Sequence, residues 1–133
     1  MGMDPSIFLT DGVITTTRGT IAEQLVGQEL LAAADPHHDT TLYFWKRPVT
    51  GSEAEIDYVV PIGQHIFPIE VKVVTTGRLK SLRQFMEQKK STLGIKISED
   101  PLSFSQGILS VPFYLVNQLL PIVKTTMNAH AAP

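Results

Sequence analysis

The 133-residue sequence contains no cysteine, which excludes disulfide bridges and thiolate metal sites. This absence fits a reducing compartment, and we expect a cytoplasmic protein. No positively charged start leads into an apolar region, so the sequence predicts no secretion signal. Charged residues make up 18% of the chain and apolar residues 43%, which is typical of one globular domain with its own core.

Charge is absent from residues 101–123, PLSFSQGILSVPFYLVNQLLPIV, a stretch long enough for a membrane span. Pro101, Pro112 and Pro121 interrupt it, and an unbroken helix accommodates proline poorly. Several serine, asparagine and glutamine residues also oppose a span. We therefore interpret this stretch as a buried strand followed by a short terminal segment, and expect no membrane contact.

Acidic and basic residues are unevenly distributed, although the formal net charge is only −2. Residues 1–70 hold 10 of the 13 acids, whereas residues 71–133 hold 8 of the 11 lysines and arginines. Such a basic segment forms either a polyanion-binding surface or a solvated helix face, and charge alone favours the solvated face. On the first interpretation, the residues that bind nucleic acid are Arg78, Lys80, Arg83, Lys89 and Lys90.

Hydrophobic periodicity predicts the order helix, three strands, helix, two strands. The helices are expected at residues 18–35 and 78–90, and the strands at 41–47, 54–60, 65–74, 93–98 and 107–116. Three consecutive strands suggest an antiparallel meander, to which the strand after the second helix adds in parallel through a crossover. The expected fold class is α/β, with a central mixed sheet flanked by helices.

Each expected helix has an apolar stripe. The first is formed by Ala22, Leu25, Val26, Leu30 and Ala33, and the second by Leu79, Leu82, Phe85 and Met86. Thr20 is the expected N-cap of the first helix, with Glu23 as the second residue of a capping box. We expect a linker or added start at residues 1–17, the folded domain at 18–120 and a flexible tail at 121–133.

The segment AEIDYVVPIGQHIFPIEVK, residues 54–72, brings charges onto a predicted hairpin. Alternation places Glu70 and Lys72 on one face, and places Asp57 on the face opposite Ile56 and Tyr58. If the hairpin turns about Gly63 and Gln64, paired positions sum to 127, and Asp57 lies opposite Glu70.

Opposed carboxylates repel each other, and a hard divalent cation such as Mg²⁺ removes the repulsion. Lys72 on the same face can orient a nucleophilic water and stabilise developing negative charge. These groups fit phosphodiester hydrolysis. Glu23 lies nearly two helical turns before Leu30, along the same helix edge. It either completes the site or serves as the capping acid, and the sequence favours neither role.

Three further side chains fit a metal or nucleic-acid site less well. His37 and His38 are adjacent on an expected loop, which is poor geometry for holding one metal ion. Trp45 can stack on a base, but aromatic residues at strand spacing more often serve in packing.

The aspartate, the EVK triplet and the upstream helical glutamate resemble the PD-(D/E)XK nuclease superfamily, with its restriction-endonuclease-like fold. More closely, six ordered segments across residues 18–118 resemble the DUF4143 domain, which usually follows an AAA-type ATPase domain. They are TIAEQLVGQELL, LYFWKR, AEIDYVV, PIEVK, LKSLRQF and ILSVPFYLV. The D-x(n)-E-x-K pattern alone is weak, whereas the ordered set is much more specific.

This resemblance implies that the catalytic residues are Glu23, Asp57, Glu70, Lys72 and Gln84. Asp57, Glu70 and the Val71 carbonyl would hold Mg²⁺ or Mn²⁺, and Lys72 would act on the nucleophilic water. Glu23 would assist through the metal or a water, and Gln84 would be a polar site residue on the following helix. Ile56 stands in place of the proline that gives the superfamily its name.

The first functional hypothesis is a Mg²⁺-dependent nuclease or nuclease-like domain that hydrolyses DNA. The alternative is a non-catalytic module that docks, dimerises or binds nucleic acid for an attached ATPase. The chain has no G-x-x-x-x-G-K-[ST] phosphate loop, so it carries no ATPase of its own. We interpret it as an excised C-terminal domain or a degenerate stand-alone form. The expected partners are DNA, an AAA-type ATPase domain in the full-length protein, and a second copy in a homodimer.

Overall fold

The computed structural model describes residues 11–32, 43–46, 55–62, 64–73 and 79–130, including the backbone but not the side chains of 11–17, 43–46 and 55. The elements are α1 (Asp11–Ala32), β1 (Tyr43–Lys46), β2 (Glu55–Ile62), β3 (His65–Val71), α2 (Lys80–Lys89), β4 (Gly94–Ser98), β5 (Ser103–Ser105), β6 (Ile108–Pro112), the 3₁₀ helix η2 (Phe113–Gln118) and α3 (Leu119–Ala129). The strands form one mixed sheet in the order β1-β2-β3-β4-β6-β5. The expected α/β class is confirmed.

The first three strands form the predicted antiparallel meander, and β4 then adds in parallel beside β3. In the β2–β3 hairpin the pairs run from Ile62↔His65 to Tyr58↔Ile69, so their numbers sum to 127 as expected. Helix α2 makes the crossover from β3 to β4. Strand β6 is also parallel to β4.

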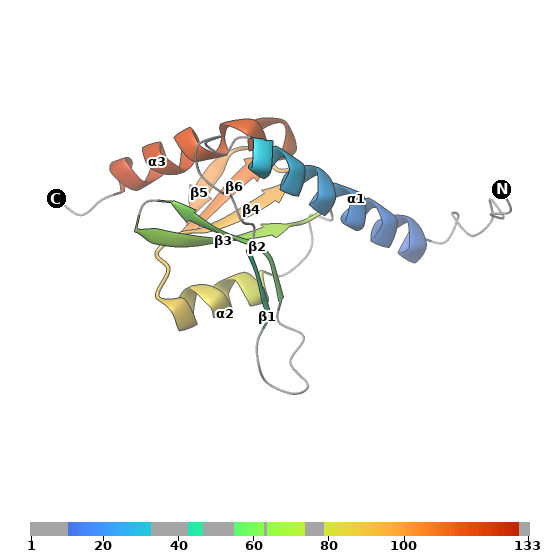
Figure 1. Cartoon of the computed structure of the whole chain (residues 1–133), viewed down its shortest axis with the longest axis horizontal. Coiled ribbons are helices and arrows are strands. Elements are labelled where there is room, and N and C mark those ends of the chain that lie inside the picture. The colour runs from blue at the N-terminus through green and yellow to red at the C-terminus, as the bar shows by residue number, and fades with distance from the viewer. Residues whose placement is uncertain (1–10, 33–42, 47–54, 63, 74–78, 131–133) are drawn as a thin grey trace, which may run out of the picture.

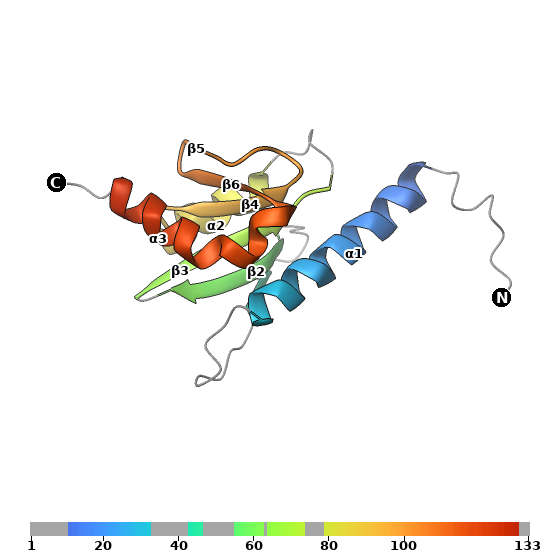
Figure 2. The same cartoon turned by 90° about the horizontal axis from the view of Figure 1, so that it is seen from above.

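Helices cover both faces of the sheet (Figure 1). On one face, α1, η2 and α3 enclose the larger core, which includes Phe67, Ile95 and Val111. On the other face α2 packs over a smaller core. From above, α1 and α3 lie over the same side of the sheet, and the N-terminal half of α1 extends beyond it (Figure 2).

The predicted stripe of α2 is the side that contacts the sheet. Leu82 and Phe85 are buried, and Leu79 and Met86 pack against them. The helix is strongly amphipathic, because its apolar residues lie on the side that packs on the sheet and its charged residues lie on the exposed side. Its C-cap Lys90 adopts a left-handed backbone conformation with φ 54°.

Helix α1 differs from its prediction because it begins at Asp11. Thr20 is therefore an interior residue, and the expected capping box is wrong. Residues 11–17 are rich in threonine and include a glycine, and this weak helix propensity suggested a linker. Val26 of the predicted stripe is buried and Leu30 packs against the core, but Leu25 is 56% exposed.

The C-terminal quarter also departs from expectation. Strand β5 was not predicted, and the expected strand at residues 107–116 ends at Pro112, where proline removes a ladder donor. The expected flexible tail is helical to Ala129, because Leu119 and Val123 form a buried stripe at helical spacing. No helix in the described part of the chain is long and apolar enough to cross a membrane.

Candidate functional site

A β-bulge in β2 positions Asp57. Tyr43 pairs with Val59 and Trp45 with Ile56, so the backbone of Asp57 and Tyr58 together faces one residue of β1. Such a bulge breaks the alternation of faces and redirects a side chain. Ile56 therefore joins the α2-side core while Tyr58 packs on the α1 side, which corrects the expectation that both share a face.

The Asp57 carboxylate lies against the backbone of β3. The β2–β3 ladder ends at Tyr58↔Ile69, and beyond it the Val71 N–H donates to Asp57 Oδ2 at 2.7 Å. Because the N–H and C=O of a strand residue face the same neighbouring strand, the Val71 carbonyl also faces the Asp57 edge. The predicted grouping of Asp57 with the Glu70–Val71 segment is thus present.

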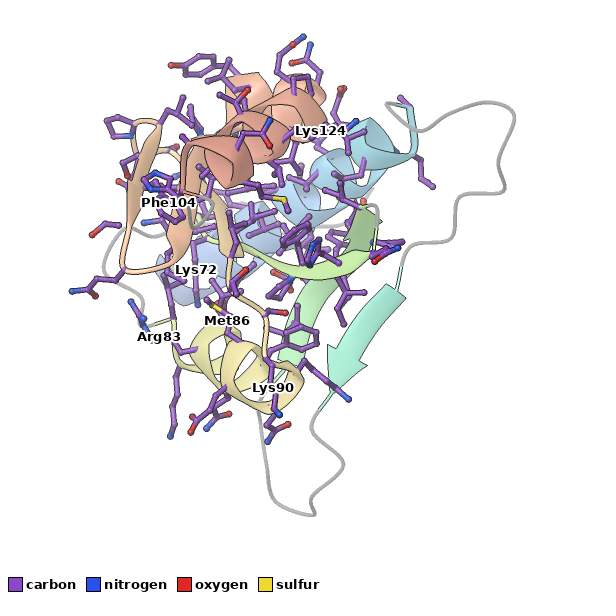
Figure 3. The ribbon with its side chains drawn as sticks, turned by 90° about the vertical axis from the view of Figure 1, so that its left-hand side faces the viewer. Lys72, Arg83, Met86, Lys90, Phe104 and Lys124 are labelled. Carbon is purple, nitrogen blue, oxygen red and sulfur yellow. The ribbon has the colours of Figure 1, made fainter. Side chains whose placement is uncertain are left out.

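Glu70 and Lys72 form an ion pair on the α2 face of the sheet. Lys72 Nζ lies 3.1 Å from Glu70 Oε1. The Glu70 residue is 9% exposed, whereas the Lys72 side chain is 29% exposed. Figure 3 shows Lys72 on the side of the sheet that faces α2. The predicted pairing of Glu70 with Lys72 on one face is therefore present.

Burial raises the pKa of the Glu70 carboxyl, and the charge of Asp57 raises it further. The charge of Lys72 and its hydrogen bond act in the opposite direction without cancelling the effect of burial. The ionised form of Glu70 is thus only partly compensated by its neighbours. A further cation would stabilise it.

Three buried oxygen atoms on this side of the sheet have no hydrogen-bond partner among the described residues. They are Glu70 Oε2, Gln84 Oε1 and Ser110 Oγ, the last on β6 in register with Lys96. Buried acceptors are nearly always paired, and an orphaned acceptor is commonly completed by a water or an ion. Gln84 belongs to α2, which packs on this face, so its oxygen lies on the same side of the sheet as Glu70 Oε2.

The oxygen ligands available here suit Mg²⁺, which keeps several waters, better than a metal ion whose ligands all come from protein side chains. No group of three or more histidine, aspartate or glutamate side chains in the described regions can hold a metal ion. Mg²⁺ commonly binds through one or two carboxylates and keeps several waters. Asp57, Glu70 and the Val71 carbonyl match this requirement.

Glu23 belongs to α1, which lies on the face of the sheet opposite the Glu70–Lys72 pair. The Tyr58 hydroxyl donates to the Glu23 backbone carbonyl at 2.7 Å. Burial raises the pKa of the Tyr58 phenol, and the charges of Glu23 and Asp57 raise it further. Tyr58 thus connects Glu23 with the Asp57 region. A catalytic role for Glu23 stays a prediction.

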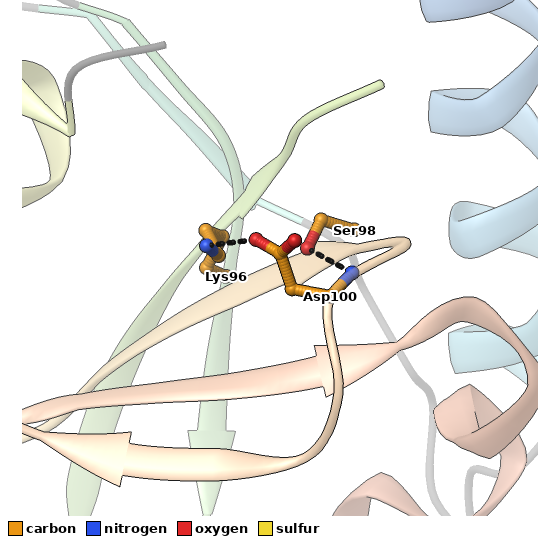
Figure 4. Close-up of polar contacts among 3 residues, drawn as sticks. All are labelled: Lys96, Ser98 and Asp100. Atoms are coloured by element: carbon orange, nitrogen blue, oxygen red, sulfur yellow. Dashed lines mark hydrogen bonds and ion pairs between the residues drawn. The ribbon is translucent and has the colours of Figure 1, made fainter. Parts of the chain in front are cut away.

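Sequence reasoning missed Lys96, the register partner of Glu70 on β4. Its ammonium group donates to Asp100 Oδ2 at 2.7 Å, and Ser98 Oγ accepts the Asp100 backbone N–H at 3.1 Å (Figure 4). The hydrogen bond from Lys96 lowers the pKa of the Asp100 carboxyl. Lys96 is thus engaged by Asp100, which leaves Lys72 as the lysine that contacts Glu70. Only the parallel register brings Lys96 here, and no local motif encodes it.

The predicted basic surface is described in part. Lys80, Arg83, Lys89 and Lys90 are exposed on or beside α2. Figure 3 shows Arg83 and Lys90 on this helix, with Lys124 on the opposite side of the sheet. Arg83 Nη2 donates to Gln106 Oε1 at 3.3 Å, which directs it toward the β5–β6 turn. Arg78, His37, His38 and the Trp45 side chain lie outside the described residues.

No curated protein and no solved structure matches the chain. The family described as "Domain of unknown function (DUF4143)" matches residues 18–116, which is more than half of the chain. This range includes Glu23, Asp57, Glu70, Lys72 and Gln84, and ends before α3. The chain therefore belongs to the DUF4143 family.

Proposed function

We propose that this domain is a Mg²⁺-dependent nuclease or nuclease-like domain that hydrolyses DNA phosphodiester bonds, of the PD-(D/E)XK type. The observation that carries the proposal is the buried Glu70 Oε2, which has no partner in the described part of the chain although Lys72 and Asp57 lie beside the same carboxylate. A carboxylate held in this way is under-compensated for a purely structural ion pair. It suits a cation-binding role.

Asp57, Glu70 and the Val71 carbonyl would hold the metal ion. When bound, Mg²⁺ polarises a phosphate oxygen and lowers the pKa of a bound water. Asp57 is already oriented by the Val71 N–H, and Glu70 is fixed by burial and by Lys72. Side chains held in this way need little reorganisation to bind a ligand.

Lys72 has the features needed to act on the attacking water. One contact of its ammonium group goes to Glu70 Oε1, which leaves other N–H donors for a water or a phosphate oxygen. Its side chain is partly exposed, so a substrate can reach it. Its positive charge stabilises the negative charge that develops on the phosphate.

The exposed lysines and Arg83 of α2 give this face of the domain its phosphate-binding character. Phosphate contacts from such side chains position DNA without reading its sequence. Because α2 packs on the face that carries Glu70 and Lys72, its exposed basic side chains lie on the same side of the sheet as the candidate site.

Cleavage of plasmid DNA with Mg²⁺ or Mn²⁺ tests the proposal. We expect Asp57→Asn, Glu70→Gln and Lys72→Ala each to lower the cleavage rate by about 100-fold or more. Asp57→Asn removes the charge but keeps an acceptor for the Val71 N–H, so its loss of activity would report on metal binding rather than on the bulge. The matched controls are Lys124→Ala on α3 and Glu87→Gln on α2, both at exposed positions, and they should keep the wild-type cleavage rate. Cleavage that persists in all three site variants would contradict the proposal.

The second candidate is a non-catalytic docking, dimerisation or nucleic-acid-binding module of an AAA-type ATPase. The Lys72–Glu70 ion pair favours it, because a structural pair alone gives a reason to retain both charges. Calorimetric titration with Mg²⁺ or Mn²⁺ distinguishes the two candidates. Micromolar to millimolar affinity that is lost in Asp57→Asn supports the nuclease, and an absence of binding supports the module.

A further inference from the structure

An open cleft of about 750 Å³ lies between α1 and the segment that follows β6. It is separate from the candidate metal site, and its lining is largely apolar. Ile21 and Leu25 on its α1 side are 51% and 56% exposed, and Tyr114 of η2 is 79% exposed. Isolated exposed apolar residues are ordinary, but three large ones around one cleft indicate an interaction surface.

The α1 side of this cleft has the spacing of a coiled-coil seam. Four of its lining residues are separated by four, three and four positions, which is the repeat of helices that pack side by side. They are Arg18, Ala22, Leu25 and Glu29. The seam therefore has a leucine and an alanine at its centre and opposite charges at its ends.

We propose that α1 pairs with α1 of a second copy of this chain, in an antiparallel arrangement about a two-fold axis. A two-fold axis at the midpoint of the seam brings each residue opposite a residue of the second copy, and the two residue numbers sum to 47. Arg18 then faces the second copy's Glu29, and Leu25 faces its Ala22, and each contact occurs twice. Opposite charges meet at both ends, and a large side chain meets a small one at the centre.

The charges also select the direction of the pairing. A parallel pair would place the two Arg18 side chains together and the two Glu29 side chains together, which is repulsive. Neither residue forms an ion pair with another residue in the described part of the chain. Glu99 also lines the cleft, on the side opposite α1, and adds a negative charge to it.

The position of α1 leaves room for a partner. The N-terminal half of the helix extends beyond the sheet, and its C-terminal half is fixed by Val26 and by Tyr58 (Figure 2). The same helix thus has one side in the core and another side open. This inference does not depend on the nuclease proposal.

Sedimentation velocity of the full chain across a concentration series tests the interface. We expect a dimer, and we expect Leu25→Asp to make the chain monomeric. We expect Arg18→Glu alone and Glu29→Arg alone each to raise the dimer dissociation constant by about tenfold or more, because each substitution acts twice by symmetry. All three residues are exposed, so their substitution leaves the fold intact.

A mixing experiment makes the test specific. Equimolar Arg18→Glu and Glu29→Arg chains should form a heterodimer, and the double variant should regain the wild-type homodimer. Gln24→Glu, an exposed α1 position outside the cleft lining, is the control for charge and should not change the dissociation constant. A monomeric wild type at about 300 μM, the range of weak specific association, would overturn the proposal. It would indicate that another segment or partner occupies the cleft. A dimer that is indifferent to Arg18 and Glu29 would overturn it equally.

Discussion

The charge of the Glu70 carboxylate is only partly compensated at the candidate site. Its pKa is raised because burial outweighs the attraction of Lys72, and Oε2 has no partner among the described residues. Burial therefore disfavours the ionised form of Glu70, although it is ion-paired. A protein tolerates such a residue where it is useful, which is the physical basis for placing a cation beside it.

Glu70→Gln should change the pH dependence of stability in a defined direction. The folded-state pKa of Glu70 lies above its ordinary value of 4.5, so its contribution to stability is fully present below that value and is lost as the pH rises through the folded-state pKa. We expect wild type to lose stability relative to Glu70→Gln across this interval, by about 1.4 kcal/mol for each unit of difference. Urea denaturation of both proteins from pH 4 to pH 8 measures this.

Glu87→Gln, an exposed position of α2, is the control and should show no such divergence. Parallel pH profiles for wild type and Glu70→Gln would contradict the expectation. Mg²⁺ should restore the stability of wild type at pH 8, by about 2.7 kcal/mol at 100 times its dissociation constant, and should leave Glu70→Gln unchanged.

At the residue scale the sequence predicts the hairpin register and the pairing of Glu70 with Lys72, since both follow from strand period and turn position. It does not predict the bulge at Asp57, because a bulge depends on how β1 pairs and has no local marker here. The orphaned oxygen atoms and the Lys96–Asp100 contact depend on packing and on parallel register. Neither can be read from residue spacing.

At the element scale, two of the three glycines of α1 lie in contrasting surroundings. A Cβ at Gly19 would meet nothing within 4 Å, whereas a Cβ at Gly27 would meet the Tyr58 hydroxyl oxygen at 2.5 Å. That hydroxyl donates to the Glu23 carbonyl, so it is not free to move aside without losing a hydrogen bond. Close packing of α1 on β2 therefore requires glycine at position 27.

Gly19→Ala and Gly27→Ala should consequently have opposite effects. Alanine in an open helical position stabilises by about 1 kcal/mol relative to glycine, and we expect this for Gly19→Ala. Gly27→Ala should destabilise by about 1–3 kcal/mol because of overpacking. The loss should shrink in a Tyr58→Phe background, where the clashing oxygen is absent. Thermal unfolding of the four variants measures this coupling, and equal effects of Gly27→Ala in both backgrounds would contradict it.

Helix α1 also shows where element prediction fails. Its weak helix formers lie at residues 11–17, and local propensity is a poor guide to where a helix begins. The stripe of α2 was predicted correctly, because an amphipathic helix on a sheet has one apolar side. The α1 stripe was only partly correct, since Leu25 belongs to the open side of the helix rather than to the core.

At the scale of the whole molecule, the sequence predicts the mixed sheet and the two-sided cover by helices, because alternating strand and helix patterns allow few topologies. It misses the C-terminal helix. The run from residue 113 onward is apolar without a clear period, so strand, helix and tail were all compatible with it. The family match also ends at residue 116, although the core continues past it.

Helix α3 should therefore be required for folding, although it lies outside the family match. Leu119 and Val123 are 3% and 0% exposed in the larger core, where Met127 also packs. Leu119→Ala should lower the free energy of unfolding by about 2–5 kcal/mol, and Leu102→Ala, at a leucine that is 48% exposed, by about 0.5 kcal/mol or less. Urea denaturation compares the two.

A chain that ends after Gln118 keeps the whole family match but loses every α3 contact. The summed loss approaches the total stability of a typical domain, about 5–15 kcal/mol, so we expect this chain not to fold cooperatively. A chain that ends after His130 keeps α3 and should unfold like the wild type. Circular dichroism during urea denaturation distinguishes the two chains. A cooperative transition in the shorter chain would show that the core folds without α3. Residues 121–133 would then be dispensable for folding, as the sequence suggests.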